Sequence, residues 1–231
     1  MKKLFLILLA LLVVGPSVSS AKKKKVKSTC GASSFENCPK AGCGGDSELN
    51  NKKNKLTKPA ASSVETYKRA DFVKLKFPKK WTAGTKRALL ETWGEGTPVV
   101  YEAYLINTKH YPSGVESCNC NLKKEENNDF HLVTVSQKNA GEDSSITAEI
   151  SPHIRPEGWT FSKLTDLSKK KTYVKITGHL MLDTQHLGAG PPIRITDWEI
   201  HPVTKMEVCT GTITGCKAGN GWTDLEDVPE P

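Results

Sequence analysis

Two pairs of acidic and histidine residues in this chain have the residue types and spacing of metal ligands. Asp129 and His131 stand two positions apart, and so do Glu199 and His201. Because successive side chains of a strand point to opposite faces, each acid would share one strand face with its histidine. Imidazole nitrogens and carboxylate oxygens bind divalent metals, so two such pairs on neighbouring strands could converge on one ion.

A buried polar network would produce the same pattern without a metal. Asp129 and Glu199 stand near expected strand starts, where a carboxylate can accept hydrogen bonds from backbone amides. The histidines can donate to carbonyl groups or to the acids, which would fix the register of the strands. No span contains a compact ligand motif such as H-E-x-x-H, so the sequence favours the network over a metal site.

Metal-assisted phosphodiester cleavage is the enzymatic hypothesis. It requires carboxylates for a hard cation and Arg or Lys for the phosphate. The acidic candidates are Asp129, Glu149 and Asp183, and the cationic candidates are Arg155, Lys175 and Arg194. A third possible polar group consists of His179, Asp183 and His186. Nucleophilic catalysis is less favoured, because there is no G-x-S-x-G motif and exported cysteines are expected to be oxidised.

The elements that must position these residues follow from apolar alternation. Strands are expected at residues 99–108, 129–136, 146–150, 173–183 and 195–209, with a short helix at 161–167. Gly178 stands where a barrel strand has to bend, and Pro202 should make the last strand change direction or lie at an edge. This order predicts a mainly β chain with a five-stranded OB-like barrel, whose surfaces usually bind rather than catalyse.

Further segments flank the expected barrel. Residues 47–56 are expected to form a polar helix, and residues 71–77 alternate as a strand with one wet face. Residues 82–93 have helical spacing with Gly94 and Gly96 as stop signals, which predicts a helix packed on the barrel. The acidic end, residues 222–231, is expected to be disordered.

The N-terminus predicts export. Residues 1–21 have the layout of a signal peptide, and no later run approaches the length of a membrane span. A basic, Cys- and Gly-containing arm (22–65), an OB-like domain with its preceding helix (66–216) and an acidic, flexible tail (217–231) should follow. The formal charge of +8 favours an anionic polymer as partner, with an envelope protein as the alternative. The expected location is periplasmic or extracellular.

Seven cysteines in an exported chain predict disulfide bonds. They are Cys30, Cys38, Cys43, Cys118, Cys120, Cys209 and Cys216. Cys209 with Cys216 could close a terminal loop, and two of the three N-terminal cysteines could close another. The odd number leaves one thiol unpaired or shared with another chain. Zinc at the N-terminal cluster is less favoured, because the cluster lacks repeated C-x-x-C spacing and a nearby His.

Several ordered motifs resemble a family of uncharacterised exported bacterial proteins. They are Gly94-Glu95-Gly96-Thr97-Pro98-Val99, Glu116-Ser117-Cys118-Asn119-Cys120, Asp129-Phe130-His131-Leu132, Ile176 to Asp183 and Trp198-Glu199-Ile200-His201-Pro202-Val203-Thr204. The similarity also takes in Cys38-Pro39 and Gly42-Cys43-Gly44-Gly45, and so spans most of the mature chain. The resemblance implies an OB-like domain in a secreted setting and carries no activity with it.

The sequence therefore favours a non-catalytic, exported binding module over a nuclease or a structural envelope protein. Aromatic side chains could serve as binding platforms: Tyr101, Tyr104, Phe130, Trp159, Tyr173 and Trp198. Of these, Phe130 and Trp198 are expected in the core. The candidate ligand-binding residues are Asp129, His131, Glu149, Lys175, Asp183, Arg194, Glu199 and His201. The candidate ligands of a divalent metal are Asp129, His131, Glu199 and His201.

Overall fold

The computed structural model describes residues 31–81, 86–187 and 193–231. Its strands are β1 (Glu65–Tyr67), β2 (Pro98–Lys109), β3 (Phe130–Val135), β4 (Ile146–Ile150), β5 (Tyr173–Leu182), β6 (Trp198–Cys209) and β7 (Trp222–Asp224). The helices are α1 (Ser47–Lys53), α2 (Arg69–Lys74), α3 (Ala88–Glu91), α4 (Phe161–Lys169) and α5 (Ile213–Lys217). The predicted signal peptide and the lysines at 22–25 lie outside the described residues.

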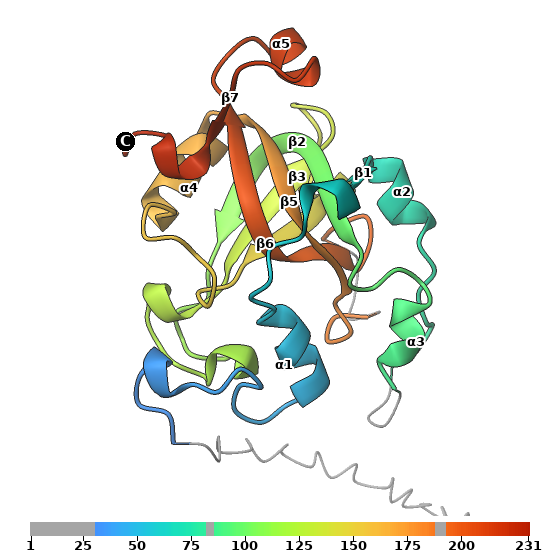
Figure 1. Ribbon diagram of the computed structural model, residues 1–231, viewed down its shortest axis with the longest axis vertical. Coiled ribbons are helices and arrows are strands. Elements are labelled where there is room, and N and C mark those ends of the chain that lie inside the picture. The colour runs from blue at the N-terminus through green and yellow to red at the C-terminus, as the bar shows by residue number, and fades with distance from the viewer. Residues whose placement is uncertain (1–30, 82–85, 188–192) are drawn as a thin grey trace, which may run out of the picture.

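Five strands close into the predicted barrel (Figure 1). Hydrogen bonding runs in the order β2-β3-β4-β6-β5, and β5 pairs back with β2. All of these pairs are antiparallel except β4 with β6, which are parallel through Ala148 and Ile200. Helix α4 connects the third barrel strand to the fourth, as expected. The order and the helix confirm an OB-like barrel.

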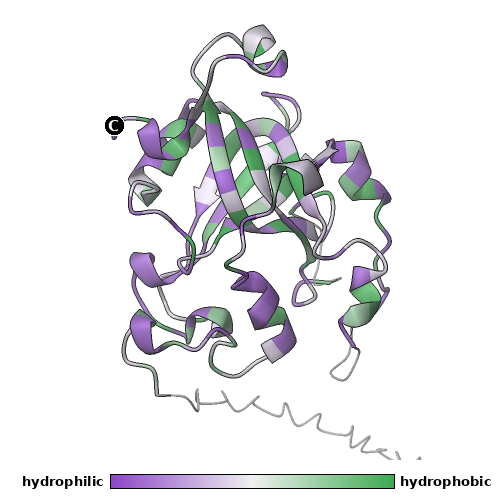
Figure 2. Cartoon of the chain, viewed as in Figure 1, coloured by the Kyte–Doolittle hydropathy of each residue, from purple (hydrophilic) through white to green (hydrophobic). Residues whose placement is uncertain are grey.

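Alternation along the strands builds the core. On β2, Val99, Tyr101, Ala103 and Leu105 are buried, while the residues between them are partly exposed. Side chains of a strand alternate between its faces, so this pattern turns one face of β2 into the barrel. Figure 2 shows apolar and polar residues alternating along β6 as well, whereas α1 is mostly hydrophilic. The predicted core positions Phe130 and Trp198 are both buried.

Gly178 lies where β5 bends against β6. The pairing register shifts on both sides of Gly178. A Cβ atom there would lie 2.5 Å from Ile200 Cγ2 and 2.5 Å from the Pro202 carbonyl oxygen. The strand containing Pro202 is thus continuous and adjusts by an irregular register rather than breaking.

We expect Gly178→Ala to lower the free energy of unfolding by about 1–3 kcal/mol, because the added methyl overpacks the β5–β6 contact. Urea unfolding followed by circular dichroism measures this change. Gly158→Ala is the matched control, since the nearest atom to its added Cβ is 3.4 Å away, on the Glu226 side chain. Equal stability of the two variants would contradict the close packing at Gly178.

Two expected elements ahead of the barrel were wrong in type or length. Residues 71–77 do not form a strand, because the Asp71 carboxylate accepts a 2.8 Å hydrogen bond from the Lys68 amide and starts α2. Phe72 is then buried against Tyr67 and Tyr101. The expected helix at 82–93 is the short α3, and residues 82–85 lie outside the described part.

The N-terminal and C-terminal segments of the described chain both pack against the rest of the protein, which the sequence does not predict. Helix α1 lies within the supposed solvated arm, yet Leu49 is only 1% exposed. The expected disorder from residue 222 onwards was wrong, because β7 pairs with β6 and Leu225 joins the hydrophobic core. Apolar burial of these few side chains outweighs the acidic character of the segment.

Two disulfide bonds are placed among the described cysteines. Cys209 pairs with Cys216, as predicted, whereas Cys38 pairs with Cys120 rather than with an N-terminal neighbour. Cys43 is also disulfide-bonded, and Cys30 lies outside the described residues. Cys118 is a buried free thiol. The Cys38–Cys120 bond spans 82 positions and ties the N-terminal segment to the loop between β2 and β3.

Candidate functional site

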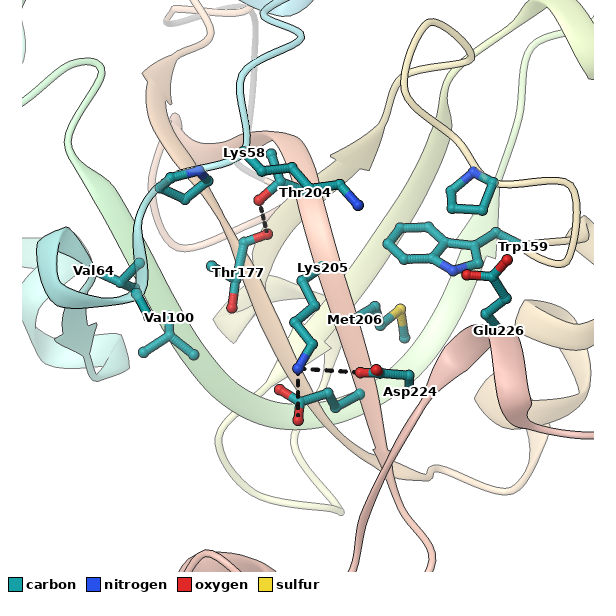
Figure 3. A pocket seen from close by; sticks show the side chains of 14 residues that line it. Lys58, Val64, Val100, Trp159, Thr177, Thr204, Lys205, Met206, Asp224 and Glu226 are labelled. Carbon is teal, nitrogen blue, oxygen red and sulfur yellow. Dashed lines mark hydrogen bonds and ion pairs between the residues drawn. The ribbon is translucent and has the colours of Figure 1, made fainter.

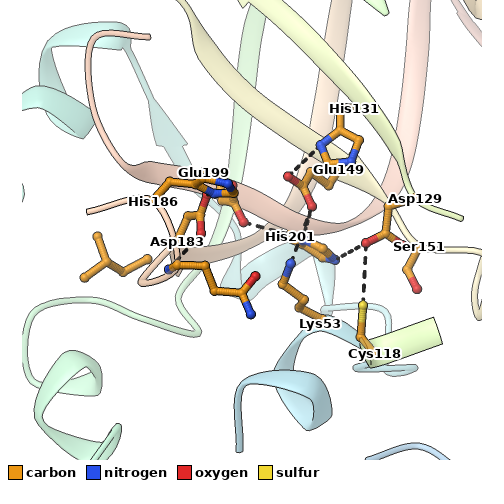
Figure 4. A network of polar contacts seen from close by, with 12 residues as sticks. Lys53, Cys118, Asp129, His131, Glu149, Ser151, Asp183, His186, Glu199 and His201 are labelled. Carbon is orange, nitrogen blue, oxygen red and sulfur yellow. Dashed lines mark hydrogen bonds and ion pairs between the residues drawn. The ribbon is translucent and has the colours of Figure 1, made fainter. Parts of the chain in front are cut away.

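Strand pairing brings the predicted acid and histidine pairs together at one end of the barrel. His131 on β3 pairs directly with Glu149 on β4. The parallel pair Ala148 and Ile200 places Glu149 beside His201 on β6. Since Ala148 and Ile200 point into the core, their neighbours Glu149 and His201 point outward. Figure 4 shows these side chains converging outside the sheet.

The N-terminal segment covers this polar face and buries it. Lys53 at the end of α1 places its Nζ atom 3.9 Å from Glu149 Oε2. The next residue, Asn54, is fully buried and donates to the carbonyl oxygens of Lys40 (2.9 Å) and Cys118 (2.8 Å). The Asp129 and His201 side chains are consequently only 1% and 0% exposed.

His201 is the centre of the cluster. Its Nδ1 atom lies 2.7 Å from Glu149 Oε2 and 3.5 Å from Glu199 Oε1, and its Nε2 atom lies 3.6 Å from Asp129 Oδ2. Even the 2.7 Å contact lacks hydrogen-bond geometry, so neither ring nitrogen has a hydrogen-bond partner among the described residues. Glu149 Oε2 and Glu199 Oε1 have none either. These atoms form an inner set around the His201 ring, with the two glutamate oxygens on the Nδ1 side and Asp129 Oδ2 on the Nε2 side.

The outer carboxylate oxygens of the same acids are each held in place. Asp129 Oδ1 accepts a 3.0 Å hydrogen bond from Asn119 Nδ2. Glu199 Oε2 accepts one of 3.1 Å from Arg194 Nη1. Glu149 Oε1 lies 2.9 Å from His131 Nδ1. Outer contacts of this kind orient metal ligands, and they leave the inner oxygens directed at His201.

A second group of charges continues from Glu199 towards the surface. Arg194 Nη2 donates to Asp183 Oδ2 at 2.6 Å, and His186 Nδ1 lies 2.6 Å from the same oxygen. The His186 side chain is 68% exposed. The third polar group is therefore only partly formed as expected: Asp183 and His186 meet, while no contact joins His179 to them among the described residues.

Burial and neighbouring charge shift the pKa values in the cluster. Burial raises the pKa of Asp129 to about 6 and also raises that of Glu199. Burial lowers the pKa of His201, but the carboxylates of Glu149, Glu199 and Asp129 together outweigh it, and the pKa rises to about 9. For Asp183, hydrogen bonding to His186 and the charge of Arg194 overcome burial and lower the pKa to about 2.

The cluster thus unites five of the eight predicted ligand-binding residues, Asp129, His131, Glu149, Glu199 and His201. Asp183 and Arg194 join it at its edge, through the contact of Arg194 with Glu199. Lys175 lies apart from it, 3.8 Å from Glu207 and over the Trp222 ring. Arg155 donates to the carbonyl oxygens of Asn128 and Glu126 and stacks on Phe130. The cations expected to clamp a phosphate therefore do not meet.

Sequence reasoning missed Lys53, Glu116 and Cys118 as members of the site. Lys53 was assigned to a solvated arm, whereas its side chain is only 13% exposed and faces Glu149. Glu116 and Cys118 belong to the loop between β2 and β3, which has no periodic pattern. The motif Glu116-Ser117-Cys118-Asn119-Cys120 was the available signal, because it carries three potential ligand types within five positions.

A separate groove crosses the outer face of β5 and β6 (Figure 3). It has a volume of about 470 Å³, with Trp159 on one side and Val64 and Val100 on the other. Lys205 in the groove is already paired, at 3.1 Å from Glu207 and 3.2 Å from Asp224. With Glu226 also lining it, carboxylates outnumber amines. This charge balance does not favour an anionic polymer in the groove.

None of the helices in the described part of the chain combines the length and apolar character needed to cross a bilayer. Comparisons with protein-family models, curated proteins and solved structures returned no match to this chain. The resemblance to exported bacterial proteins stays a prediction.

Proposed function

We propose that this protein is an exported binding module whose OB-like barrel holds a divalent transition-metal ion with Asp129, Glu149 and His201. The observation that carries the proposal is the inner set of atoms. The ligand atoms of these three residues lie within 4.8 Å of one another. They are buried, and the ring nitrogens of His201 and Glu149 Oε2 lack hydrogen bonds. Disulfide bonds among the described residues support an oxidising compartment.

The ligand types favour zinc or a neighbouring first-row metal over Mg²⁺ or Ca²⁺. Imidazole suits zinc, whereas Mg²⁺ and Ca²⁺ prefer oxygen ligands alone. Two ligand atoms on one tetrahedral zinc ion lie about 3.3 Å apart when each bond is about 2.0–2.1 Å. The 3.6 Å between His201 Nε2 and Asp129 Oδ2 is close to that separation. Glu149 Oε2 contacts Nδ1 instead, so the Glu149 side chain would have to turn towards Nε2 to bind the same ion.

A structural network without metal is the second candidate function, and the charge balance favours it. Five carboxylates (Glu116, Asp129, Glu149, Asp183 and Glu199) face Lys53, Arg194 and three imidazoles (His131, His186 and His201). The cluster is neutral when all three imidazoles are protonated. A metal ion would replace imidazolium protons, since it binds the neutral ring. The nuclease and anionic-polymer hypotheses gain no support from this geometry.

Elemental analysis and calorimetry test the metal proposal. Protein purified without chelator should contain zinc or a similar metal, and chelator-treated protein should bind added Zn²⁺. Loss of an outer contact already costs 10–100-fold in affinity, so Glu149→Gln should weaken this binding event by about 100-fold or more. His201→Gln should have the same effect, and the thermal melt of each variant shows that it is folded.

Glu207→Gln is the matched control, because Glu207 also pairs with lysines, Lys175 and Lys205, but lies outside the cluster. Its Zn²⁺ affinity should equal that of the wild type. Folded wild-type protein that contains no metal and releases no heat with Zn²⁺ would overturn the proposal and leave the structural network. Equal loss in Glu207→Gln and Glu149→Gln would also overturn it.

A further inference from the structure

Cys118 lies beside the proposed metal position, although it is not one of its ligands. The residue is only 2% exposed, and its thiol is free. Its Sγ atom lies 3.9 Å from Asp129 Oδ2, the same oxygen that faces His201. In Figure 4, dashed lines join Asp129 both to Cys118 and to His201. The thiol and the imidazole therefore contact the same carboxylate oxygen.

Glu116 completes a second group of ligand atoms. Ligand atoms of Glu116, Cys118 and Asp129 lie within 4.8 Å of one another. Glu116 Oε2 is held by the Asp129 amide at 2.9 Å and by Asn119 Nδ2 at 2.7 Å. Asn119 is fully buried between the two carboxylates, and its Oδ1 atom has no hydrogen-bond partner among the described residues. An unpaired buried acceptor beside this group calls for a water molecule or an ion as its partner.

We infer that Glu116, Cys118 and Asp129 form a second metal position with a thiolate ligand, and that Asp129 bridges the two ions. This inference rests on the proposed function, because it shares Asp129 with the first position. A thiolate selects a thiophilic metal of the zinc class. On binding, the sulfur–hydrogen bond breaks, its proton passes to water and the sulfur lone pair binds the metal. Carboxylate-bridged pairs of this kind hold their ions about 3.5–4 Å apart in other proteins.

Titration with Co²⁺ tests the inference on the full chain with its disulfide bonds intact. Cobalt substitutes for zinc and gives a thiolate-to-metal charge-transfer absorption band only when sulfur is a ligand. Wild-type protein should bind two equivalents and show the band. Cys118→Ser should bind one equivalent without the band. Glu116→Gln keeps the thiol and should weaken the band-forming event by about 100-fold, so it serves if the Ser variant fails to fold.

His201→Gln separates the two positions. It should lose one equivalent and keep the band. One equivalent without a band, abolished by His201→Gln and unchanged in Cys118→Ser, would overturn the second position and leave the proposed function intact. A band with one equivalent that His201→Gln does not alter would overturn the first position and the bridge. Absence of any Co²⁺ binding by folded wild type would overturn both.

Discussion

Arg194→Leu should lower the free energy of unfolding by about 3–5 kcal/mol, the cost of leaving buried charges without their partner. Arg194 contacts Asp183 at 2.6 Å and Glu199 at 3.1 Å. Both carboxylates are nearly inaccessible, with side chains 7% and 0% exposed. Removing the guanidinium leaves two buried negative charges next to Glu149. Urea unfolding of metal-free protein at neutral pH measures the loss.

Lys205→Met is the control for this prediction. Lys205 also contacts two carboxylates, Glu207 at 3.1 Å and Asp224 at 3.2 Å, but its side chain is 50% exposed. Solvent screens such pairs, so the variant should change the free energy of unfolding by less than about 1 kcal/mol. Similar losses in the two variants would mean that burial does not set the strength of the Arg194 contacts.

The second large effect is a loss of stability of metal-free protein between pH 6.5 and about 9. The pKa of His201 rises from its usual 6.5 to about 9 in the folded state, because Glu149, Glu199 and Asp129 together outweigh burial. Protonated His201 therefore stabilises the fold fully below pH 6.5, and this contribution is lost as the pH rises through 9. A shift of this size corresponds to about 3 kcal/mol. The pKa of Asp129 is raised to about 6, so the Asp129 carboxyl changes the stability mainly below this pH range.

Unfolding curves from pH 6 to 9 measure this effect. The experiment uses the Cys118→Ser background, so that no thiolate attacks the disulfide bonds during unfolding. Adding His201→Gln should make stability nearly independent of pH in this window, except for what His131 contributes. His131 also has a raised pKa, because Glu149, Glu116 and Asp129 together outweigh burial. A wild-type slope that persists in the double variant would assign the effect to another group.

The barrel could be predicted because each of its strands is marked by a pattern within a short stretch of sequence. Alternation marked each strand, and the order of strands with one helix is typical of an OB-like barrel. The same alternation placed Asp129 with His131 and Glu199 with His201 on shared faces. Once β3, β4 and β6 are neighbours, these pairs must meet. Glu149 follows from the same register, since it stands opposite His131.

What covers the site could not be predicted, because it depends on contacts between distant segments. In the sequence, Lys53 belongs to a basic arm. Its place in the site could not be predicted without knowing that Cys38 pairs with Cys120 and ties this segment to the barrel. The strand expected at 71–77 failed for a related reason: alternation was present, but a side-chain cap at Asp71 and the burial of Phe72 favoured a helix. The alternation of apolar and polar residues shows which face of a strand is buried, but it does not show which distant segment covers that face.

Anomalous X-ray scattering from crystals grown with Zn²⁺ locates the bound ion. We expect a strong difference peak on the outer face of β3, β4 and β6, about 2.0–2.2 Å from an oxygen of Asp129, an oxygen of Glu149 and a nitrogen of His201. Peaks confined to the molecular surface, with a continuous chain of ordered waters or direct hydrogen bonds joining these three side chains, would contradict the proposed metal site.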